Sequence, residues 1–284
     1  MCDWQAHFQP TVNEAIMPKV TIATAAYNVL SSCGLEAMEE SVRSVAALPV
    51  EHEHIIYDGA STDGTLEALR KLGKEISTLR IVSEKDSGIY DALNKCLRDA
   101  RGDYFYVLGM DDRIIDGEAF CECVTKALRN KADMLIAKVV MQDKRDVRPA
   151  TMFGSYRHAR MHSYSHQGVM VRTALLKEYP FDQSYRITAD YKQLLTLNWN
   201  GARVCMLNKK IAYCSQAGVS SMVTEKCAEE TIRVQKEVYS LTDIEIKKFL
   251  DSGFLPFRVV AHLLFVGGVF SLFMGLSIFG SYIW

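Results

Sequence analysis

Apolar runs and amphipathic stretches alternate along the first half of the chain. Runs rich in β-branched and aromatic residues predict buried strands, and apolar positions repeated every three or four residues predict helices. The predicted strands are 20–26, 53–57, 79–83, 103–108 and 134–141, and the predicted helices are 35–48, a short one that ends at 72, 89–100 and 118–130, with a loop over 28–34. This alternation predicts an α/β layered domain whose mostly parallel central sheet is flanked by helices.

The second half of the chain has a less regular pattern. Residues 142–166 are rich in Arg, Lys and His, and we expect either a mobile loop over one end of the sheet or a solvated surface loop. Thr242 to Glu245 has the pattern of a capping box, which predicts that another helix begins there. The other predicted strands are 167–171, 203–207 and 211–215, and the other predicted helices are 173–178, 189–199 and 224–239.

The last 26 residues, 259–284, contain no Asp, Glu, Lys or Arg. At about 1.5 Å per residue, a helix of this length exceeds the roughly 30 Å hydrocarbon core of a bilayer. We therefore expect a C-terminal apolar helix that spans or lies in the membrane. Lys247, Lys248 and Arg258 precede it, which predicts an inner-membrane protein whose body faces the cytoplasm. A buried core helix and a re-entrant or in-plane helix are the alternatives.

Small residues recur every four positions in this segment, at Gly267, Ser271 and Gly275. Such a stripe lets two helices approach closely in lipid, so a homodimer through the C-terminal helix is one interpretation. The other is that glycine is simply common in membrane helices.

Composition and charge exclude several classes of protein. With 49% hydrophobic and 24% charged residues, the chain is not disordered. Lys and Arg number 33 against 34 Asp and Glu, so we expect no nucleic-acid partner. The eight cysteines include no Cys-x-x-Cys pair, and residues 1–16 contain no apolar leader. These features argue against a zinc site and for reduced thiols.

Polar residues follow four of the predicted strands in turn. They are Tyr27 and Asn28, Asp58, the stretch 84–86, and the pair Asp111 and Asp112. Ligands of parallel α/β sheets bind beyond the carboxyl ends of the strands, where these residues would form one polar rim. The sequence therefore predicts an active site at that edge.

The adjacent aspartates indicate the chemistry of this rim. Carboxylate oxygens together with substrate phosphates suit a hard cation such as Mg²⁺. Because adjacent residues of a strand face opposite ways, one of Asp111 and Asp112 can bind metal and the other ribose or water. An ordinary acidic turn before Ile114 is the alternative. No Gly-x-Gly-x-x-Gly or P-loop pattern follows the first strand, which argues against NAD-linked and P-loop chemistry.

Six segments carry a resemblance to a known family. The chain resembles a family 2 glycosyltransferase of the GT-A fold, of the colanic-acid and O-antigen type, over residues 18–222. That resemblance implies a GT-A domain at 18–222. With the membrane helix predicted from the apolar run placed at 258–284, the chain also has an N-terminal extension at 1–17 and a helical linker at 223–257. The matching segments are TIATAAYN (21–28), IIYDGASTDGT (55–65), SEKDSGIYDALNKCL (83–97), GDYFYVLGMDD (102–112), SHQGVMVR (165–172) and FDQSYRITADYKQLL (181–195).

The resemblance also implies an activity and site residues. The family moves a sugar, with inversion, from a nucleotide-diphosphate sugar, here to a lipid-linked or saccharide acceptor in surface polysaccharide synthesis. By resemblance, Asp112 ligates Mg²⁺ or Mn²⁺, and Asp190 is the general base unless it caps the helix that ends at Trp199. The other implied residues bind the donor (Ala26, Tyr27, Asn28, Asp58, Asp86, Gly88, Asn94 and Asp111) or the acceptor (Arg157 and His166).

Two other functions compete with this interpretation. A sugar-phosphate nucleotidyltransferase shares the layered architecture, but it needs a Gly-rich loop with Arg or Lys after the first strand, and that loop is missing. A membrane-tethered nucleotide-sugar-binding protein would not need Asp112 or Asp190. The Gln-x-x-Arg-Trp motif of processive synthases is also missing, which predicts the addition of a single sugar.

Overall fold

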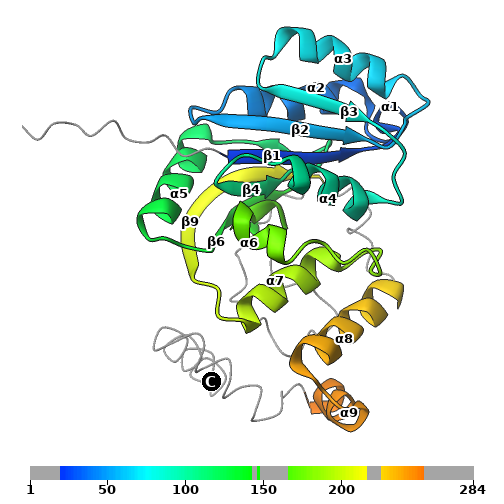
Figure 1. Ribbon diagram of the computed structural model, residues 1–284, viewed down its shortest axis with the longest axis vertical. Helices are drawn as coiled ribbons and strands as arrows, with labels where there is room; N and C mark the ends of the chain where they lie inside the picture. Colours follow the sequence, from blue (N-terminus) through cyan, green and yellow to red (C-terminus); the bar gives the residue numbers. More distant parts are fainter. Residues whose placement is uncertain (1–19, 143–145, 148–165, 216–224, 253–284) are drawn as a thin grey trace, which may run out of the picture.

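One nine-stranded sheet organises the chain in the computed structural model, which describes residues 20–142, 146–147, 166–215 and 225–252 (Figure 1). The strands lie in the order β3-β2-β1-β4-β8-β6-β9-β5, and β7 pairs with β6. The bounds are β1 Val20–Ala26, β2 His52–Asp58, β3 Leu79–Ser83, β4 Tyr104–Val107, β5 Arg113–Ile114, β6 Met134–Met141, β7 Asp146–Val147, β8 Val169–Arg172 and β9 Val204–Cys214.

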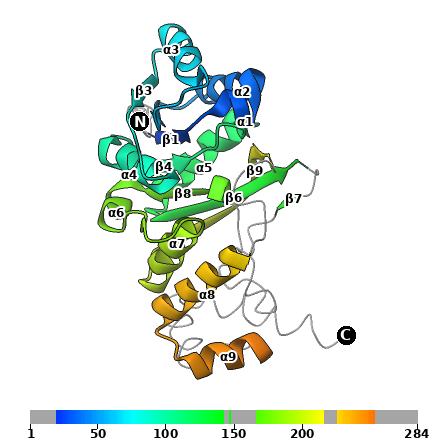
Figure 2. The same ribbon diagram turned by 90° about the vertical axis from the view of Figure 1, so that its right-hand side faces the viewer.

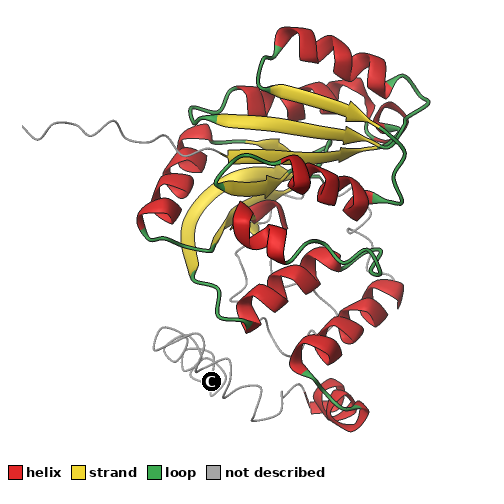
Figure 3. Cartoon of the chain, viewed as in Figure 1, coloured by secondary structure: helices red, strands yellow, loops and turns green. Residues whose placement is uncertain are grey.

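Helices cover both faces of the sheet (Figure 3). Strand β4 shows why, because Tyr104 and Tyr106 pack on the side of α5 while Phe105 packs on the side of α4. A strand buried on both faces is apolar throughout, as this one is. The helices are α1 Val29–Ser32, α2 Gly34–Ala46, α3 Thr65–Glu75, α4 Ile89–Asp99, α5 Gly117–Arg129, α6 Thr173–Glu178, α7 Ala189–Trp199, α8 Glu225–Tyr239 and α9 Asp243–Ser252.

The sheet is mixed, so the expectation of a mostly parallel sheet was wrong. Four of the described strand pairings are parallel and four are antiparallel. Strand β8 causes much of the difference, because it lies between β4 and β6 and runs opposite to both. Strands β1 to β4 nevertheless run in one direction, as the strand-helix alternation predicted.

Strand β9 and helix α1 differ from the expected elements. Two strands were expected over 203–207 and 211–215, but β9 is one strand. Its pairing with β6 shifts register between Ile136 and Val139, so an irregularity in the ladder accommodates the polar stretch 208–210. Helix α1 occupies part of the expected loop over 28–34.

Helix α8 belongs to the same hydrophobic core as the sheet. Val234 and Tyr239 pack in the cluster that contains residues of β1, α4 and α7. Figure 2 shows α8 and α9 stacked below α7. The predicted capping box at the start of α9 is confirmed: the Thr242 backbone N–H donates to Glu245 Oε2 (2.9 Å), and the Glu245 N–H donates to Thr242 Oγ1 (3.3 Å).

Several predictions fall on other parts of the chain. The extension 1–17, residue Arg157 and the apolar segment 258–284 lie outside the described residues. Within the described residues, no helix has both the length and the apolar character that crossing a membrane requires. Seven of the eight cysteines fall in this part of the chain, and all seven are free thiols.

Candidate active site

The predicted polar rim forms where three parallel strands end in register. Ala26, the last residue of β1, pairs with Asp58, the last residue of β2, and Asp58 pairs with Ser83 at the end of β3. The fully buried Asp58 carboxylate accepts hydrogen bonds from Ser83 Oγ (2.6 Å), Ser61 Oγ (2.5 Å) and the Ser61 backbone N–H (3.2 Å). Asp58 therefore ties two strand ends and a turn together at the centre of the rim.

The turn after β1 is tied to the turn after β2. Asn28, whose backbone is left-handed (φ 47°), donates its N–H to Ser61 Oγ (2.8 Å). Its side-chain oxygen accepts from the Thr62 N–H (2.9 Å). Tyr27 beside it is 64% exposed. The structure thus holds the backbone at Asn28 and leaves the aromatic ring of Tyr27 accessible to a ligand.

Tyr27 and Asp86 meet over Gly59. A Cβ atom at position 59 would lie 2.6 Å from Asp86 Oδ2 and 3.3 Å from Tyr27 Cδ2, so only glycine fits without displacing them. Residues from the ends of β1 and β2 and from the loop after β3 thus come together. An exposed aromatic ring beside a carboxylate suits stacking on a nucleobase and hydrogen bonding to ribose hydroxyls.

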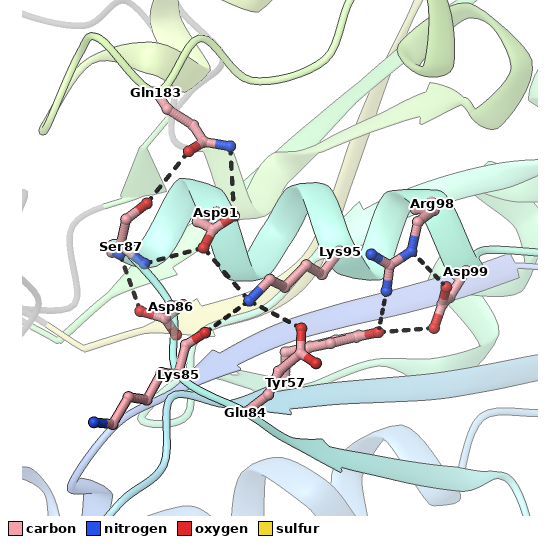
Figure 4. Close-up of polar contacts among 11 residues, drawn as sticks. Tyr57, Glu84, Lys85, Asp86, Ser87, Asp91, Lys95, Arg98, Asp99 and Gln183 are labelled. Atoms are coloured by element: carbon pink, nitrogen blue, oxygen red, sulfur yellow. Dashed lines mark hydrogen bonds and ion pairs between the residues drawn. The ribbon is translucent and has the colours of Figure 1, made fainter.

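Lys95 of α4 holds the loop that carries Asp86 (Figure 4). Its Nζ donates to the Lys85 carbonyl oxygen (2.9 Å) and forms ion pairs with Glu84 (2.9 Å) and Asp91 (3.5 Å). These contacts join the end of β3 to the second turn of α4. Lys95 therefore fixes the loop between β3 and α4, which carries Asp86.

The same loop ends at the first turn of α4. Gly88 is the N-cap of that helix, and its N–H donates to Asp86 Oδ1 (3.0 Å). The Ser87 N–H donates to Asp91 Oδ2 (3.0 Å), and Ser87 Oγ donates to Gln183 (Figure 4). The predicted donor residues Asp86 and Gly88 are therefore in direct contact.

Asn94 stands apart from this group. Its side-chain Nδ2 donates to the Phe181 carbonyl oxygen (2.8 Å), and its Oδ1 accepts from the Phe181 N–H (2.9 Å). Both polar ends of the amide hold one loop residue. This pairing indicates that Asn94 supports the loop before α7, and the structure does not bring it to the rim.

Asp112 is buried and linked to three segments. Its side chain is only 3% exposed; Oδ1 accepts from the Ser215 N–H (2.8 Å), and Oδ2 accepts from Gln167 Nε2 (2.8 Å) and the Gly109 N–H (3.3 Å). Burial, and then the charge of half-buried Asp111, raise the pKa of Asp112 to about 6. A Cβ atom at Gly109 would lie 2.6 Å from Asp112 Oδ2, so this turn too requires glycine.

The two aspartates fit a divalent cation. Burial first, and repulsion by Asp111 second, raise the pKa of Asp112, and a positive ion beside the two carboxylates would offset both effects. Oδ1 of Asp112 accepts a single hydrogen bond and retains a lone pair. Among the described residues, no group of three or more His, Cys, Asp or Glu side chains clusters as metal ligands. A cation here would complete its shell with water and substrate phosphate, as Mg²⁺ commonly does.

Asp190 lies in the first turn of α7, but it is not the N-cap. Thr188 occupies that position, so the structure does not support the capping alternative. Asp190 Oδ1 accepts from the Tyr191 N–H (2.8 Å) and from the Tyr90 hydroxyl (3.1 Å), and Oδ2 lies 3.6 Å from His166 Nδ1. The carboxylate is 21% exposed, which leaves it accessible to a substrate.

Tyr90 connects the Asp190 carboxylate to the loop 84–88 between β3 and α4, which we call the donor loop. It follows Gly88 by two residues, and its hydroxyl lies 2.6 Å from the Ile187 carbonyl oxygen and 3.1 Å from Asp190 Oδ1, so its one proton is shared between these two acceptors. Burial, and then the charge of Asp190, raise the pKa of Tyr90 far above its ordinary value, so the phenol keeps its proton. Sequence reasoning missed this residue, although it lies in the segment 83–97 that carried the resemblance. Its partner is 100 residues away in the chain.

The fold and these contacts define a GT-A glycosyltransferase. Residues 21–179, more than half of the chain, match the family described as glycosyl transferase family 2. The chain therefore belongs to this family, which confirms the resemblance to family 2 found in the sequence, while the colanic-acid and O-antigen type stays a prediction.

Three similar proteins extend this result. The chain is 23% identical over 180 residues to a PGL/p-HBAD biosynthesis glycosyltransferase of Mycobacterium bovis, which covers 62% of this chain and 70% of the relative. It is 36% identical over 100 residues to a putative teichuronic acid biosynthesis glycosyltransferase, TuaG, of Bacillus subtilis. That match covers 34% of this chain and 37% of TuaG. The fold is similar to that of the mannosyltransferase PcManGT from Pyrobaculum calidifontis in complex with GDP-Man and Mn²⁺. That similarity has a TM-score of 0.62 at 16% identity and covers 95% and 82% of the two chains.

Proposed function

We propose that this chain is an inverting glycosyltransferase that moves one sugar from a nucleotide-diphosphate sugar to a lipid-linked or saccharide acceptor in surface polysaccharide synthesis. One observation carries the proposal: the start of α4 contacts both the polar rim, where the donor would bind, and the carboxylate of Asp190. Gly88 at this start contacts Asp86, and Tyr90 in the first turn contacts Asp190. A donor bound at the rim would then lie close to one available base.

The chemistry follows from this juxtaposition. Asp190 removes the proton of the acceptor hydroxyl as its oxygen attacks the anomeric carbon from the side opposite the diphosphate, which inverts that centre. Tyr90 contacts Asp190 Oδ1, and Oδ2, which lies 3.6 Å from His166 Nδ1, would take the proton. Bound at Asp112, beside the donor-binding Asp111, Mg²⁺ or Mn²⁺ would neutralise the charge on the departing nucleoside diphosphate.

The relatives support the donor and the pathway. PcManGT is bound to GDP-Man and Mn²⁺, which favours a nucleotide sugar and a divalent cation here. TuaG is named for teichuronic acid biosynthesis, which favours a role in polymer synthesis. Tyr27 and Asp86, which meet over Gly59, would contact the nucleotide of the donor.

A donor screen tests the proposal. The full chain is incubated with a panel of nucleotide-diphosphate sugars, Mn²⁺ and a lipid and saccharide extract as the acceptor source, and release of nucleoside diphosphate is scored. We expect release from one donor class, and loss of release when Mn²⁺ is chelated. Binding of a donor without release would favour a nucleotide-sugar-binding protein, and formation of pyrophosphate would favour a nucleotidyltransferase.

We also propose that the segment 258–284 places the protein at the inner membrane with its catalytic domain in the cytoplasm. The long run without Asp, Glu, Lys or Arg supports this location, and the small residues within it favour a homodimer. We expect the full chain to stay in the membrane pellet after an alkaline carbonate wash and a truncation after Gly253 to be released. If the full chain washes off and truncation changes nothing, the segment is not an anchor.

A further inference from the structure

Three consecutive backbone N–H groups just before α7 end on one carboxylate. Glu230 of α8 accepts from the N–H of Arg186 (3.0 Å) with Oε1, and from those of Ile187 (2.9 Å) and Thr188 (3.1 Å) with Oε2. Thr188 Oγ1 adds a fourth hydrogen bond to Oε2 (3.2 Å). Glu230 is 8% exposed, so this cluster is largely removed from water.

These N–H groups lie at the N-terminal end of α7, where backbone N–H groups need a partner from outside the helix. The first N–H groups of a helix have no partner within the helix, and a side chain or ligand must satisfy them. The Thr188 N-cap of α7 makes no capping hydrogen bond with its own side chain. Glu230 instead binds the N–H of this cap and those of the two loop residues before it, so α8 fixes the loop that leads into α7.

The same segment is held on its other side by the donor loop and α4. The Arg186 guanidinium donates to the Ser87 carbonyl oxygen (2.6 Å), and the Tyr90 hydroxyl contacts the Ile187 carbonyl oxygen (2.6 Å). Residues 186–188 therefore lie between Glu230 and the first turn of α4. Asp190 follows two residues later, so a shift of this segment would move its carboxylate.

We propose that Glu230 is a positioning residue, which fixes segment 186–188 and through it the orientation of the Asp190 carboxylate. The inference rests on the proposed role of Asp190 as the base. It makes α8, which lies beyond the family match at 21–179, part of the catalytic unit. The sequence predicted this region to be a linker, for which such a role was not expected.

The variant Glu230→Gln tests the proposal. The amide nitrogen of Gln cannot accept the N–H groups that one carboxylate oxygen now binds, so segment 186–188 should shift while the donor rim stays in place. We expect kcat for sugar transfer to fall about 10- to 100-fold, because small misplacements of reacting groups carry large rate penalties. The dissociation constant for the nucleoside diphosphate should change much less than kcat does, because Glu230 reaches the loop that carries Asp86 only through Arg186, whose guanidinium contacts the Ser87 carbonyl oxygen.

A matched control comes from the same helix. Glu237 also links α8 to α7, through an ion pair with Lys192 (2.6 Å), and its interactions stop at Tyr185, one residue before segment 186–188. Glu237→Gln should leave kcat within about twofold of the parent value. If both variants lower kcat equally, general loosening of α8 explains the effect and the positioning role is wrong.

A double-variant cycle separates this proposal from the proposed function. In an Asp190→Asn background, Glu230→Gln should lower the residual rate little further, because two residues that act as a unit are not additive. The same loss in both backgrounds would overturn the proposal. If Glu230→Gln fails to fold, Glu230→Asp, which keeps the charge but shortens the reach, should lower kcat with donor affinity intact. Full kcat in a folded variant would overturn the proposal, whereas full activity of Asp190→Asn would instead refute the proposed function.

Discussion

Asp190→Asn should lower the rate of sugar transfer by about 10² to 10⁴, the usual loss when a general base is removed. A carboxamide cannot take the proton of the acceptor hydroxyl. Its oxygen can still accept the hydrogen bonds that the Tyr191 N–H and the Tyr90 hydroxyl now donate to Oδ1, so the start of α7 should keep its structure. Steady-state kinetics together with donor titration would show a loss in kcat and little change in donor affinity.

Asp182→Asn provides the matched control for this experiment. Asp182 precedes α7 and pairs with Lys192 (2.7 Å), so its removal changes an ion pair of α7 without touching Asp190. We expect transfer by this variant to stay within about twofold of the parent, since the pair is only half-buried and lies away from the reacting groups. An equal loss of donor affinity and transfer rate in Asp190→Asn would indicate that Asp190 has a structural role.

Asp112→Ala should abolish metal-dependent donor turnover, and Asp111→Ala should have a smaller effect. Asp112 is the more buried of the two, and it carries the retained lone pair described above. The measurement is the rate of nucleoside diphosphate release as a function of Mn²⁺ concentration. Near-normal turnover of Asp112→Ala at saturating Mn²⁺ would contradict its assignment as the metal ligand.

Asp112 also joins Gln167 and Ser215, so its removal has a structural component. Asp112→Asn is the second variant needed, because its side-chain oxygen can still accept one of these hydrogen bonds. We expect this variant to stay folded and to lose metal-dependent turnover. Restored turnover in Asp112→Asn would show that the carboxylate acts only by packing and hydrogen bonding.

Local patterns predicted the elements of the first half well. The strands 20–26, 79–83 and 134–141 have the predicted bounds. For 20–26 and 134–141 the reason is that runs of buried apolar residues are typical of strands covered on both faces, whereas 79–83 is a mostly half-buried edge strand. Helices 173–178 and 189–199 were also predicted with their observed bounds. The rim was predictable for a related reason, since the carboxyl ends of parallel strands meet at one edge.

Long-range pairing explains what the sequence did not reveal. The direction of β8 depends on its neighbours β4 and β6, and its four residues carry no signal for direction. The polar stretch 208–210 separated two predicted strands, but pairing with β6 keeps it within one strand. In general, strand preference depends more on neighbours than helix preference does.

In the candidate site, too, the positions of the residues could be predicted from local patterns, but their long-range partners could not. Asp58, Asp86, Asp111 and Asp112 follow strands, so their common edge could be predicted. The partners of these residues could not, because Asp112 binds Gln167 and Ser215, 55 and 103 residues away. Glu230 was missed for this reason as well: a glutamate in a charged helix looks like a solvated residue until its contact 42 to 44 residues away is known.

The anomeric configuration of the product tests the central claim most directly. Once the screen has identified a donor, the transferred sugar can be followed by proton NMR during a single turnover with the full chain. The account predicts that the new glycosidic bond has the configuration opposite to that of the donor, because one base and one displacement invert the anomeric carbon. A product that retains the donor configuration would contradict a single displacement with Asp190 as the base.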